Sequence, residues 1–254
     1  MANEEKKKAE IVTQEGATGF PIVDVADAHD AMLGAFDQLG ISSFNLSKLS
    51  IPAGGMTAFE VDDPIKGQSV EQTVRAVIAC VKAGQKAWWS TSVEDGGAGS
   101  PPDCKSEDGV TGFGNNTLEP TTEAASFKCA TCPWNQWESN RGGGMGKDCQ
   151  DHSLMFFFME NRRLPTVLKV PATSLKALQR YAMALIDHGK RLEGVITEIS
   201  LKKATSRGGI VYSELDLRMI EELPVAEGDH MKAVATSLKD RLLGFDAFAV
   251  ADEA

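Results

Sequence analysis

Four of the five cysteines of this 254-residue chain lie between positions 104 and 149. Cys129 and Cys132 form a C-x-x-C pair, which Cys104 precedes by 24 intervening residues and Cys149 follows after 16. Four thiolates can surround one tetrahedral metal ion, and Zn²⁺ is the usual occupant of such sites. The stretch is rich in Gly, Pro, Asn, Ser and Thr and has no apolar periodicity on which to fold. We therefore predict a structural Zn²⁺ site, in which metal binding replaces the missing hydrophobic core.

Other uses of these cysteines stay open. A redox C-x-x-C pair would open a helix after a strand, whereas Pro133 and Trp134 lead here into glycines. Disulfides would need an oxidising compartment, and the N-terminus shows no secretory signal. Unrelated free thiols, iron in the same four-sulfur site, and replacement of one cysteine ligand by His152 are the remaining alternatives. Cys80 lies in an apolar run and is expected in the core.

No catalytic motif accompanies the cysteines. A zinc ion with four protein ligands has no open position for a water molecule. The glycine run RGGGMGKD differs from a phosphate-binding loop, because Arg141 stands where the first glycine belongs and Asp148 stands where Ser or Thr would bind Mg²⁺. The chain also lacks H-E-x-x-H, G-x-S-x-G and the H-x-E motif of zinc deaminases. We therefore expect that the protein is not an enzyme.

Charge is distributed unevenly along the chain. The formal net charge is −10, yet residues 141–208 carry 12 Lys and Arg against 6 Asp and Glu. A basic central part favours a local anionic ligand, and the acidic flanks oppose indiscriminate binding. The N-terminus has no apolar signal segment, and no run of about 18 apolar residues occurs anywhere. We expect a cytoplasmic protein without membrane contact.

Hydrophobic periodicity predicts the elements that must position these residues. The expected elements are a helix at 24–39, extended segments at 43–61, strands at 73–81, 86–92, 154–160 and 166–170, a helix at 173–189, a hairpin of strands at 195–201 and 210–220, and a final helix at 229–243. Three strands, a helix and a hairpin follow one another as in the five-stranded OB barrel. We therefore predict a mainly β (α+β) protein, with a five-stranded OB-like barrel, an inserted zinc-binding loop and flanking helices. Another α+β sandwich is the alternative, because strand order alone does not close a barrel.

The predicted organisation has four parts. They are a flexible N-terminal arm at 1–20, an OB-like core at 21–222 with the zinc-binding insertion at about 94–152, a C-terminal helix at 223–244, and an acidic tail at 245–254.

Several strings of the sequence resemble a group of small phage and prophage proteins. These strings are CPWNQWES, GMGKDC, LPTVLKVPATSLKALQRYAMAL and VITEISLKKA, and the likeness covers about residues 70–222. Some members of that group are described as single-stranded-DNA-binding replication or recombination proteins. A zinc-bearing OB barrel with an acidic C-terminal segment is also distantly similar to the single-stranded-DNA-binding proteins of the phage T4 type, although the cysteine spacing and the place of the basic part differ. The resemblance implies a phage protein in the host cytoplasm, whose acidic tail docks replication or recombination proteins.

Single-strand binding without sequence preference requires cations for the phosphates and exposed aromatic rings for the bases. The candidate cations are Arg141, Lys147, Arg162, Arg163, Lys169, Lys202, Lys203 and Arg207. The candidate stacking residues are Trp88, Trp89, Trp134, Trp137, Tyr212 and Phe113. Each of these has an ordinary alternative, since single Lys and Arg side chains are commonly solvated, and tryptophans commonly lie in a core or cover a metal site. Trp88 and Trp89 are adjacent, so in a strand they point to opposite faces.

A second class of function stays open beside DNA binding. A zinc-stabilised protein-interaction or assembly factor without nucleic-acid affinity would agree with the net charge of −10. A zinc finger that reads duplex DNA is disfavoured, because no recognition helix adjoins the cysteines. Salt dependence separates the first two classes, since DNA binding releases counterions and weakens with added salt.

Overall fold

The computed structural model describes residues 14–15, 21–22, 34, 38, 46–52, 54–63, 67–91, 101–118, 125–162, 164–206 and 208–244. Over these residues the chain is mainly β, as predicted. The predicted acidic tail lies outside the described residues, and so do most of the predicted N-terminal arm and of the helix expected at 24–39. None of the helices in the described ranges has the length and apolar character needed to cross a membrane.

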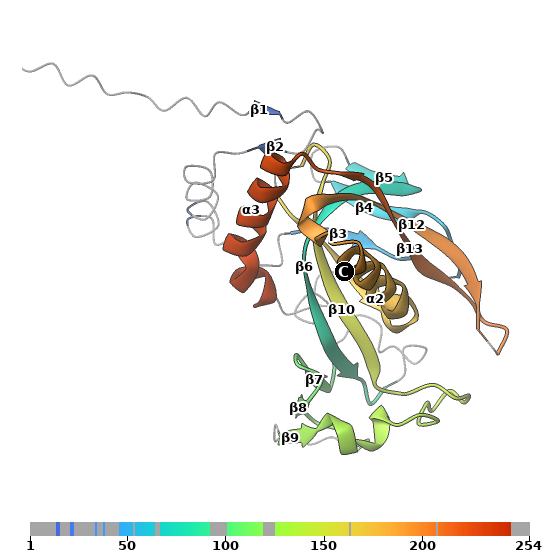
Figure 1. Cartoon of the computed structure of the whole chain (residues 1–254). Coiled ribbons are helices and arrows are strands. Elements are labelled where there is room, and N and C mark those ends of the chain that lie inside the picture. The colour runs from blue at the N-terminus through green and yellow to red at the C-terminus, as the bar shows by residue number, and fades with distance from the viewer. Residues whose placement is uncertain are drawn as a thin grey trace, which may run out of the picture.

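Five strands form the centre of the large sheet (Figure 1). They are β6 (Thr73–Trp88), β10 (Gln150–Met159), β11 (Thr166–Pro171), β12 (Val195–Thr205) and β13 (Val211–Glu222). β6 pairs antiparallel with β10 along one edge and with β12 along the other, and their outer neighbours are β11 and β13. The order across the sheet is therefore β11-β10-β6-β12-β13.

The described pairings do not close these five strands into a barrel. Closure would require β11 to pair with β13, but β11 instead pairs in parallel with β3 (Ser47–Ser50). The sheet continues from β3 through β4 (Phe59–Asp63) to β5 (Gly67–Glu71). The prediction of a closed five-stranded barrel omitted these strands, because extended segments at 43–61 carried no signal of where they pair. A separate two-stranded ribbon joins β1 (Gln14–Glu15) to β2 (Pro21–Ile22).

The two faces of the sheet carry separate hydrophobic cores. Met155 and Phe157 of β10 belong to the core under helix α2 (Ala172–Asp187), and Phe156 and Phe158 belong to the core under helix α3 (Val225–Leu243). This division follows from the alternation of side chains along a strand. The run from Leu154 to Phe158 is buried along its whole length because each face of the sheet is covered by a helix.

Helix α2 is tied to the hairpin by a buried hydroxyl. Neither Thr173 nor Ser174 caps this helix, because the N-cap residue is Pro171 and no side chain caps the first turn. Ser174 is fully buried, and its Oγ accepts a hydrogen bond of 3.0 Å from the backbone N–H of Leu215 in β13. The hydroxyl thus satisfies a buried donor in a neighbouring strand.

The turn between β3 and β4 is hydrogen-bonded to the first residues of β13. The hydroxyl of Ser213 donates to the carbonyl oxygens of Pro52 and Met56, at 3.0 and 2.8 Å. A Cβ added at Gly55 would lie 2.4 Å from Val211 Cγ1, so any residue larger than glycine would displace the start of β13.

β6 is one strand where two were predicted, and it continues beyond the cores. The expected strands at 73–81 and 86–92 merge across a β-bulge at Ala83 and Gly84. There the register against β10 shifts, and Gly84 has φ of +79°. The far end of β6 pairs with β7 (Cys104–Ser106), followed by β8 (Thr111–Gly114) and β9 (Ala125–Lys128). Two short 3₁₀ turns, η3 (Cys129–Thr131) and η4 (Pro133–Asn135), complete this end of the molecule (Figure 1). We call the described residues from 101 to 149 the cysteine module.

Candidate metal centre and nucleic-acid interface

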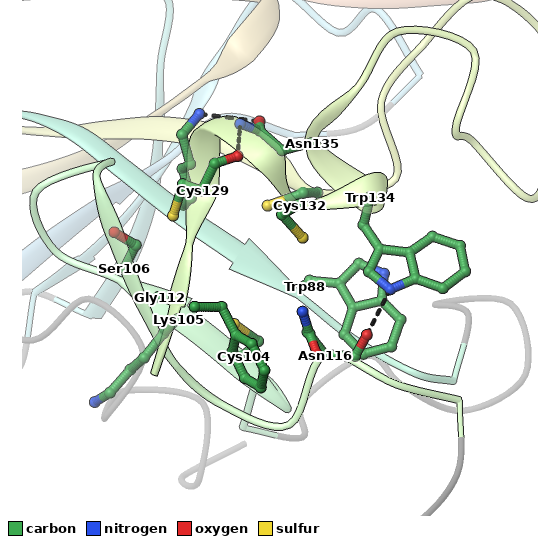
Figure 2. Close-up of a pocket in the computed structure, with 13 residues that line it drawn as sticks. Trp88, Cys104, Lys105, Ser106, Gly112, Asn116, Cys129, Cys132, Trp134 and Asn135 are labelled. Atoms are coloured by element: carbon green, nitrogen blue, oxygen red, sulfur yellow. Dashed lines mark hydrogen bonds between the residues drawn. The ribbon is translucent and has the colours of Figure 1, made fainter. Parts of the chain in front are cut away.

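The structure brings the four predicted cysteine ligands to one pocket. Cys104 opens β7, Cys129 opens η3, Cys132 lies between the two 3₁₀ turns, and Cys149 directly precedes β10. All four line the same pocket, and Figure 2 shows Cys129 and Cys132 on the C-x-x-C turn and Cys104 on a different segment. The other lining residues are Lys86, Trp88, Lys105, Ser106, Gly112, Asn116, Phe127, Trp134 and Asn135. Residues far apart in the chain therefore meet around a common centre.

Hydrogen bonds hold the C-x-x-C segment in place of apolar packing. The N–H of Cys132 donates to the carbonyl oxygen of Cys129, at 3.3 Å. The Asn135 side chain donates to that same oxygen at 2.8 Å, and the Gln136 side chain donates to the carbonyl oxygens of Ala130 and Cys132, both at 3.0 Å. The N–H of Cys149 reaches the carbonyl oxygen of Trp134 at 2.9 Å, which joins the last cysteine to this turn.

In residue type, the four cysteines of the pocket fit a metal ion with sulfur ligands. All five cysteines of the chain are free thiols, and a Cβ built on Gly112 would lie 3.1 Å from Cys104 Sγ and 3.6 Å from Cys129 Sγ. Two sulfurs thus face the space that a side chain at position 112 would fill. As placed, no three His, Cys, Asp or Glu side chains within the described ranges form a group that could hold an ion. Coordination would therefore require the sulfurs to move closer together.

Burial keeps two of the thiols protonated in the absence of a cation. Burial is the largest cause and the neighbouring cysteines add to it, and together they raise the pKa of Cys104 to about 11 and that of Cys149 to about 12. The Lys86 ammonium acts in the opposite direction on Cys149. An incoming metal cation would have to displace these protons, so metal binding here would release protons and would weaken as the pH falls.

His152 lies apart from the pocket. It is 2% exposed, belongs to β10, and stands opposite the buried Gln85 of β6. Burial, reinforced by the nearby Lys169 ammonium, lowers the pKa of His152 to about 4, so the imidazole is neutral at pH 7. His152 is not among the described residues that line the pocket, and the candidate metal ligands there are the four cysteines.

One side of the site is covered by four side chains that contact one another. We call them the clasp, and they are Trp88, Trp134, Arg141 and Asp148. Trp88 and Trp134 stack with ring centroids 5.1 Å apart and planes 16° from parallel. The Arg141 guanidinium lies 5.3 Å from the Trp88 ring centroid and 5.6 Å from that of Trp134. Asp148 accepts hydrogen bonds from Trp88 Nε1 at 2.6 Å and from Arg141 Nε at 2.8 Å. Arg141 also donates to the backbone oxygens of Trp89 and Ser90, so its donors are directed into the protein.

A charged network joins the cysteine module to the long strands. The Lys86 and Lys147 ammonium groups both donate to Asn135 Oδ1 and to the carboxylate of Asp151. These lysines pull the pKa of Asp151 below its usual range, against the opposing effect of burial. One carboxylate thus holds two cations beside the cysteines, and Asn135 links them to the C-x-x-C turn.

Two of the predicted aromatic residues lie beside predicted cations. Trp137 is 73% exposed, with the Lys147 ammonium 5.5 Å from its ring centroid. Trp89 is half-buried, with the Lys169 ammonium of β11 at 6.0 Å. Trp88 is 2% exposed, and Trp134 donates from Nε1 to the carbonyl oxygen of Asn116 at 2.7 Å. The indoles of Trp88 and Trp134 therefore cover the cysteine pocket, as the alternative interpretation allowed.

The remaining predicted residues are dispersed. Arg162 donates to Ser47 Oγ at 3.1 Å, and the Lys202 ammonium stands 3.9 and 3.7 Å from carboxylates of β13. Lys203 of β12 is exposed and Tyr212 of β13 is half-buried, and both lie near the turn that joins these two strands. Arg163 and Arg207 lie outside the described residues.

Sequence reasoning missed the residues that organise the centre. Lys86, Asn135, Asp148 and Asp151 were not among the candidates, although each is bonded to the cysteine module or to its clasp. Asp148 and Asp151 flank Cys149 in the sequence, and that proximity was the signal available.

Comparisons of the chain with protein families, with curated proteins and with solved structures found no match. What the site does must therefore be inferred from its own residues and contacts.

Proposed function

We propose that this protein binds single-stranded DNA without sequence preference. The observation that carries the proposal is the pairing of an exposed indole and a half-buried indole with lysine ammonium groups, Trp137 with Lys147 and Trp89 with Lys169. A base can stack on an indole while a phosphate meets the adjacent cation, and this combination requires no particular base.

The arrangement of strands supports the same proposal. The five central strands lie in the order β11-β10-β6-β12-β13, with helix α2 between β11 and β12, and this is the strand order of an OB fold opened between its third and fifth strands. In OB folds, nucleic acid binds across the second and third strands and the loop joining the first two. Lys169 lies on the third of these strands, and Trp137 and Lys147 lie in the connection between the first two.

We propose that Cys104, Cys129, Cys132 and Cys149 hold a structural Zn²⁺. The ion would supply crosslinking in a module that has little apolar content of its own. The protein's own contacts would hold the module in position, because the Trp88–Trp134 stack and the Asn135 hydrogen bonds fix it against β6. Four sulfur ligands leave no open coordination position, so the proposed role is structural and not enzymatic.

The resemblance in the sequence supports a place in phage DNA replication or recombination. The proposed partners are single-stranded DNA and, through the tail at 245–254, replication or recombination proteins. The proposed site of action is the host cytoplasm.

The test is fluorescence anisotropy of a labelled oligo-dT titrated with the protein at low and at moderate salt. Saturable binding that weakens with salt and is poorly competed by duplex would support the proposal. Trp89→Ala and Trp137→Ala should each weaken binding by about 1–3 kcal/mol. Ile186→Ala is the matched control, because Ile186 is 65% exposed on α2, away from the cysteine module.

The second candidate is a zinc-stabilised protein-interaction or assembly factor. The net charge of −10 and the inward-directed Arg141 favour it. If oligo-dT does not bind at low salt while the metal is present, this second function replaces the first.

A further inference from the structure

The side chain of Asn135 links the cysteines to the exposed Trp137. Its Nδ2 donates to the carbonyl oxygen of Cys129 at 2.8 Å (Figure 2), and its Oδ1 accepts from the Lys147 ammonium at 3.3 Å. The same ammonium lies 5.5 Å from the ring centroid of Trp137. A continuous series of contacts thus runs from a candidate metal ligand, through one amide and one cation, to an exposed indole.

Asp151 holds the same ammonium from a second side. Its carboxylate accepts from Lys147 at 3.2 Å and also from Lys86, whose ammonium donates to Asn135 Oδ1 at 3.2 Å. These bonds are partly buried, and hydrogen bonds between charged groups are stronger there than in water. Asp151 belongs to β10, whereas Asn135 belongs to the C-x-x-C turn. Lys147 therefore has one support in the sheet and one support that moves with the turn.

Metal binding would shift the turn to which Asn135 belongs. Within the described ranges, no three His, Cys, Asp or Glu side chains are placed closely enough to hold an ion, so coordination requires the sulfurs to approach one another. Asn135 is bonded to both cysteines of the C-x-x-C pair, since its side chain reaches the Cys129 carbonyl oxygen and its backbone N–H donates to that of Cys132 at 3.1 Å. Movement of this pair onto a metal ion therefore displaces Asn135 and, through it, the Lys147 ammonium.

We infer that Asn135 is a positioning residue that makes the affinity for single-stranded DNA depend on metal occupancy. With the metal bound, Asn135 holds the Lys147 ammonium beside the Trp137 ring, where it meets the phosphate next to the stacked base. The inference rests on the proposed function and adds a regulation of that same site. An ammonium has three donors, and the contacts with Asn135 and Asp151 use two of them, so one N–H can reach a phosphate oxygen.

This coupling has to be reciprocal. A metal ion that strengthens DNA binding is itself bound more strongly in the presence of DNA, by the same factor. Reciprocity gives the inference a second measurable quantity, which is the affinity for zinc with and without an oligonucleotide.

The test measures oligo-dT affinity by fluorescence anisotropy for the zinc-loaded and the chelator-treated protein, and it compares the ratio of the two dissociation constants. Wild-type protein should bind oligo-dT about fivefold or more tightly with zinc than without it. Asn135→Asp keeps an acceptor for the lysine ammonium groups but loses the Nδ2 donor to Cys129, so its ratio should fall toward 1. The added negative charge weakens binding in both states and cancels in the ratio.

Gln136→Ala is the matched control. The Gln136 side chain donates to the carbonyl oxygens of Ala130 and Cys132, so it holds the same turn without contacting Lys147 in the described hydrogen bonds. Its loss should weaken zinc binding and leave the ratio of oligo-dT dissociation constants unchanged. Competition with a chromogenic chelator should show that oligo-dT raises the zinc affinity of the wild-type protein by the factor seen in the anisotropy, and that of Asn135→Asp by less.

The outcomes separate this inference from the proposed function. A wild-type ratio of 1, with oligo-dT bound in both states, would overturn the inference and leave the function standing. An Asn135→Asp ratio equal to the wild-type ratio would mean that metal loss acts by unfolding the whole module, and the inference would again be overturned.

An equal fall in the ratio for Gln136→Ala and Asn135→Asp would show that any loosening of the turn has this effect, which also overturns the role of Asn135. Oligo-dT binding by a protein that takes up no zinc would overturn the inference alone. If the zinc-loaded wild-type protein binds no oligo-dT, the proposed function and the inference fail together.

Discussion

Trp88 at the end of β6 lies face to face with Trp134 of the C-x-x-C turn, with 5.1 Å between their ring centroids. The first indole belongs to the longest strand of the sheet, and the second belongs to a turn held by hydrogen bonds. Aromatic pairs of this geometry stabilise a protein by about 0.5–1.5 kcal/mol beyond the area they bury. The pair is thus a main apolar connection between the cysteine module and the sheet.

Removing one member of this pair should loosen the cysteine module. Trp134→Ala is expected to lower the free energy of unfolding by about 2–4 kcal/mol and to speed metal release, because Trp88 and the Arg141 guanidinium lose their packing partner. Trp137→Ala, at a 73% exposed indole three residues along, should change stability by less than about 0.5 kcal/mol. Urea unfolding and the rate of zinc transfer to a chromogenic chelator measure both effects. Equal behaviour of the two variants would contradict the stacked arrangement.

The chain should carry about one zinc ion, bound by the cysteines of the module. Cys132→Ala is expected to abolish stoichiometric zinc, because it leaves three sulfur ligands and an open coordination position. Cys80→Ala is the matched control, since Cys80 is a partly buried thiol in the α3-side core. Elemental analysis of the purified variants gives the metal content, and a red colour would identify iron instead. If the wild-type protein stays metal-free in the presence of zinc, the proposed zinc site is wrong.

A side chain at position 112 should interfere with zinc binding if the adjacent Cys104 and Cys129 are zinc ligands. A Cβ there would approach Cys104 Sγ to 3.1 Å, so Gly112→Ala is expected to weaken zinc binding roughly tenfold or more. Gly146→Ala tests the specificity of that effect, because its nearest neighbour is the flexible side chain of Asn140 at 3.4 Å. Competition with a zinc chelator of known affinity reports both values. Unaltered zinc affinity in Gly112→Ala would show that the ion does not lie between these strands.

Stability should fall as the pH drops from about 6.5 to about 4. In the folded chain the pKa of His152 is lowered to about 4 by burial and by the Lys169 ammonium, while the unfolded chain has the ordinary value of 6.5. Between those values the unfolded state binds the extra proton, so acid favours unfolding, by about 3 kcal/mol at most. Below about pH 4 the contribution no longer changes.

The variant His152→Gln isolates this effect from the other titrating groups. Its unfolding free energy, measured by urea at pH 7.5, 6 and 5, should depend less on pH than that of the wild-type protein. Parallel curves for the two proteins would mean that His152 is not buried as a neutral imidazole.

The secondary structure was largely predictable, because it depends on local alternation. The LMFFFM run, the hairpin that includes Val195 and Tyr212, and helix α2 all follow from apolar spacing and turn residues. The parallel pairing of β3 with β11 was not predictable, since Leu49 and Leu168 are 119 positions apart and nothing local specifies their register. Ser174 illustrates the same limit, because its partner Leu215 becomes adjacent only after the strands have assembled.

For the candidate site, residue types predicted the cysteines but not their supports. Four cysteines in one stretch are visible without a structure. The pairing of Lys86 with Asp151 depends on the register of β6 against β10, and that register contains a bulge at Gly84. Likewise, adjacency placed Trp88 and Trp89 on opposite faces, but only the fold determined which of the two lies under Arg141.

Because β6 runs without interruption from the helix-covered cores to Trp88, the cysteine module and the sheet share one backbone ladder with β10. Opening the module would expose the amides at the end of this ladder first. Hydrogen exchange in metal-loaded protein should therefore show protection extending through residues 85–88 at nearly the level of residues 76–78. After chelation, residues 85–88 should exchange early while residues 76–78 remain protected, so that one cooperative unfolding unit separates into two.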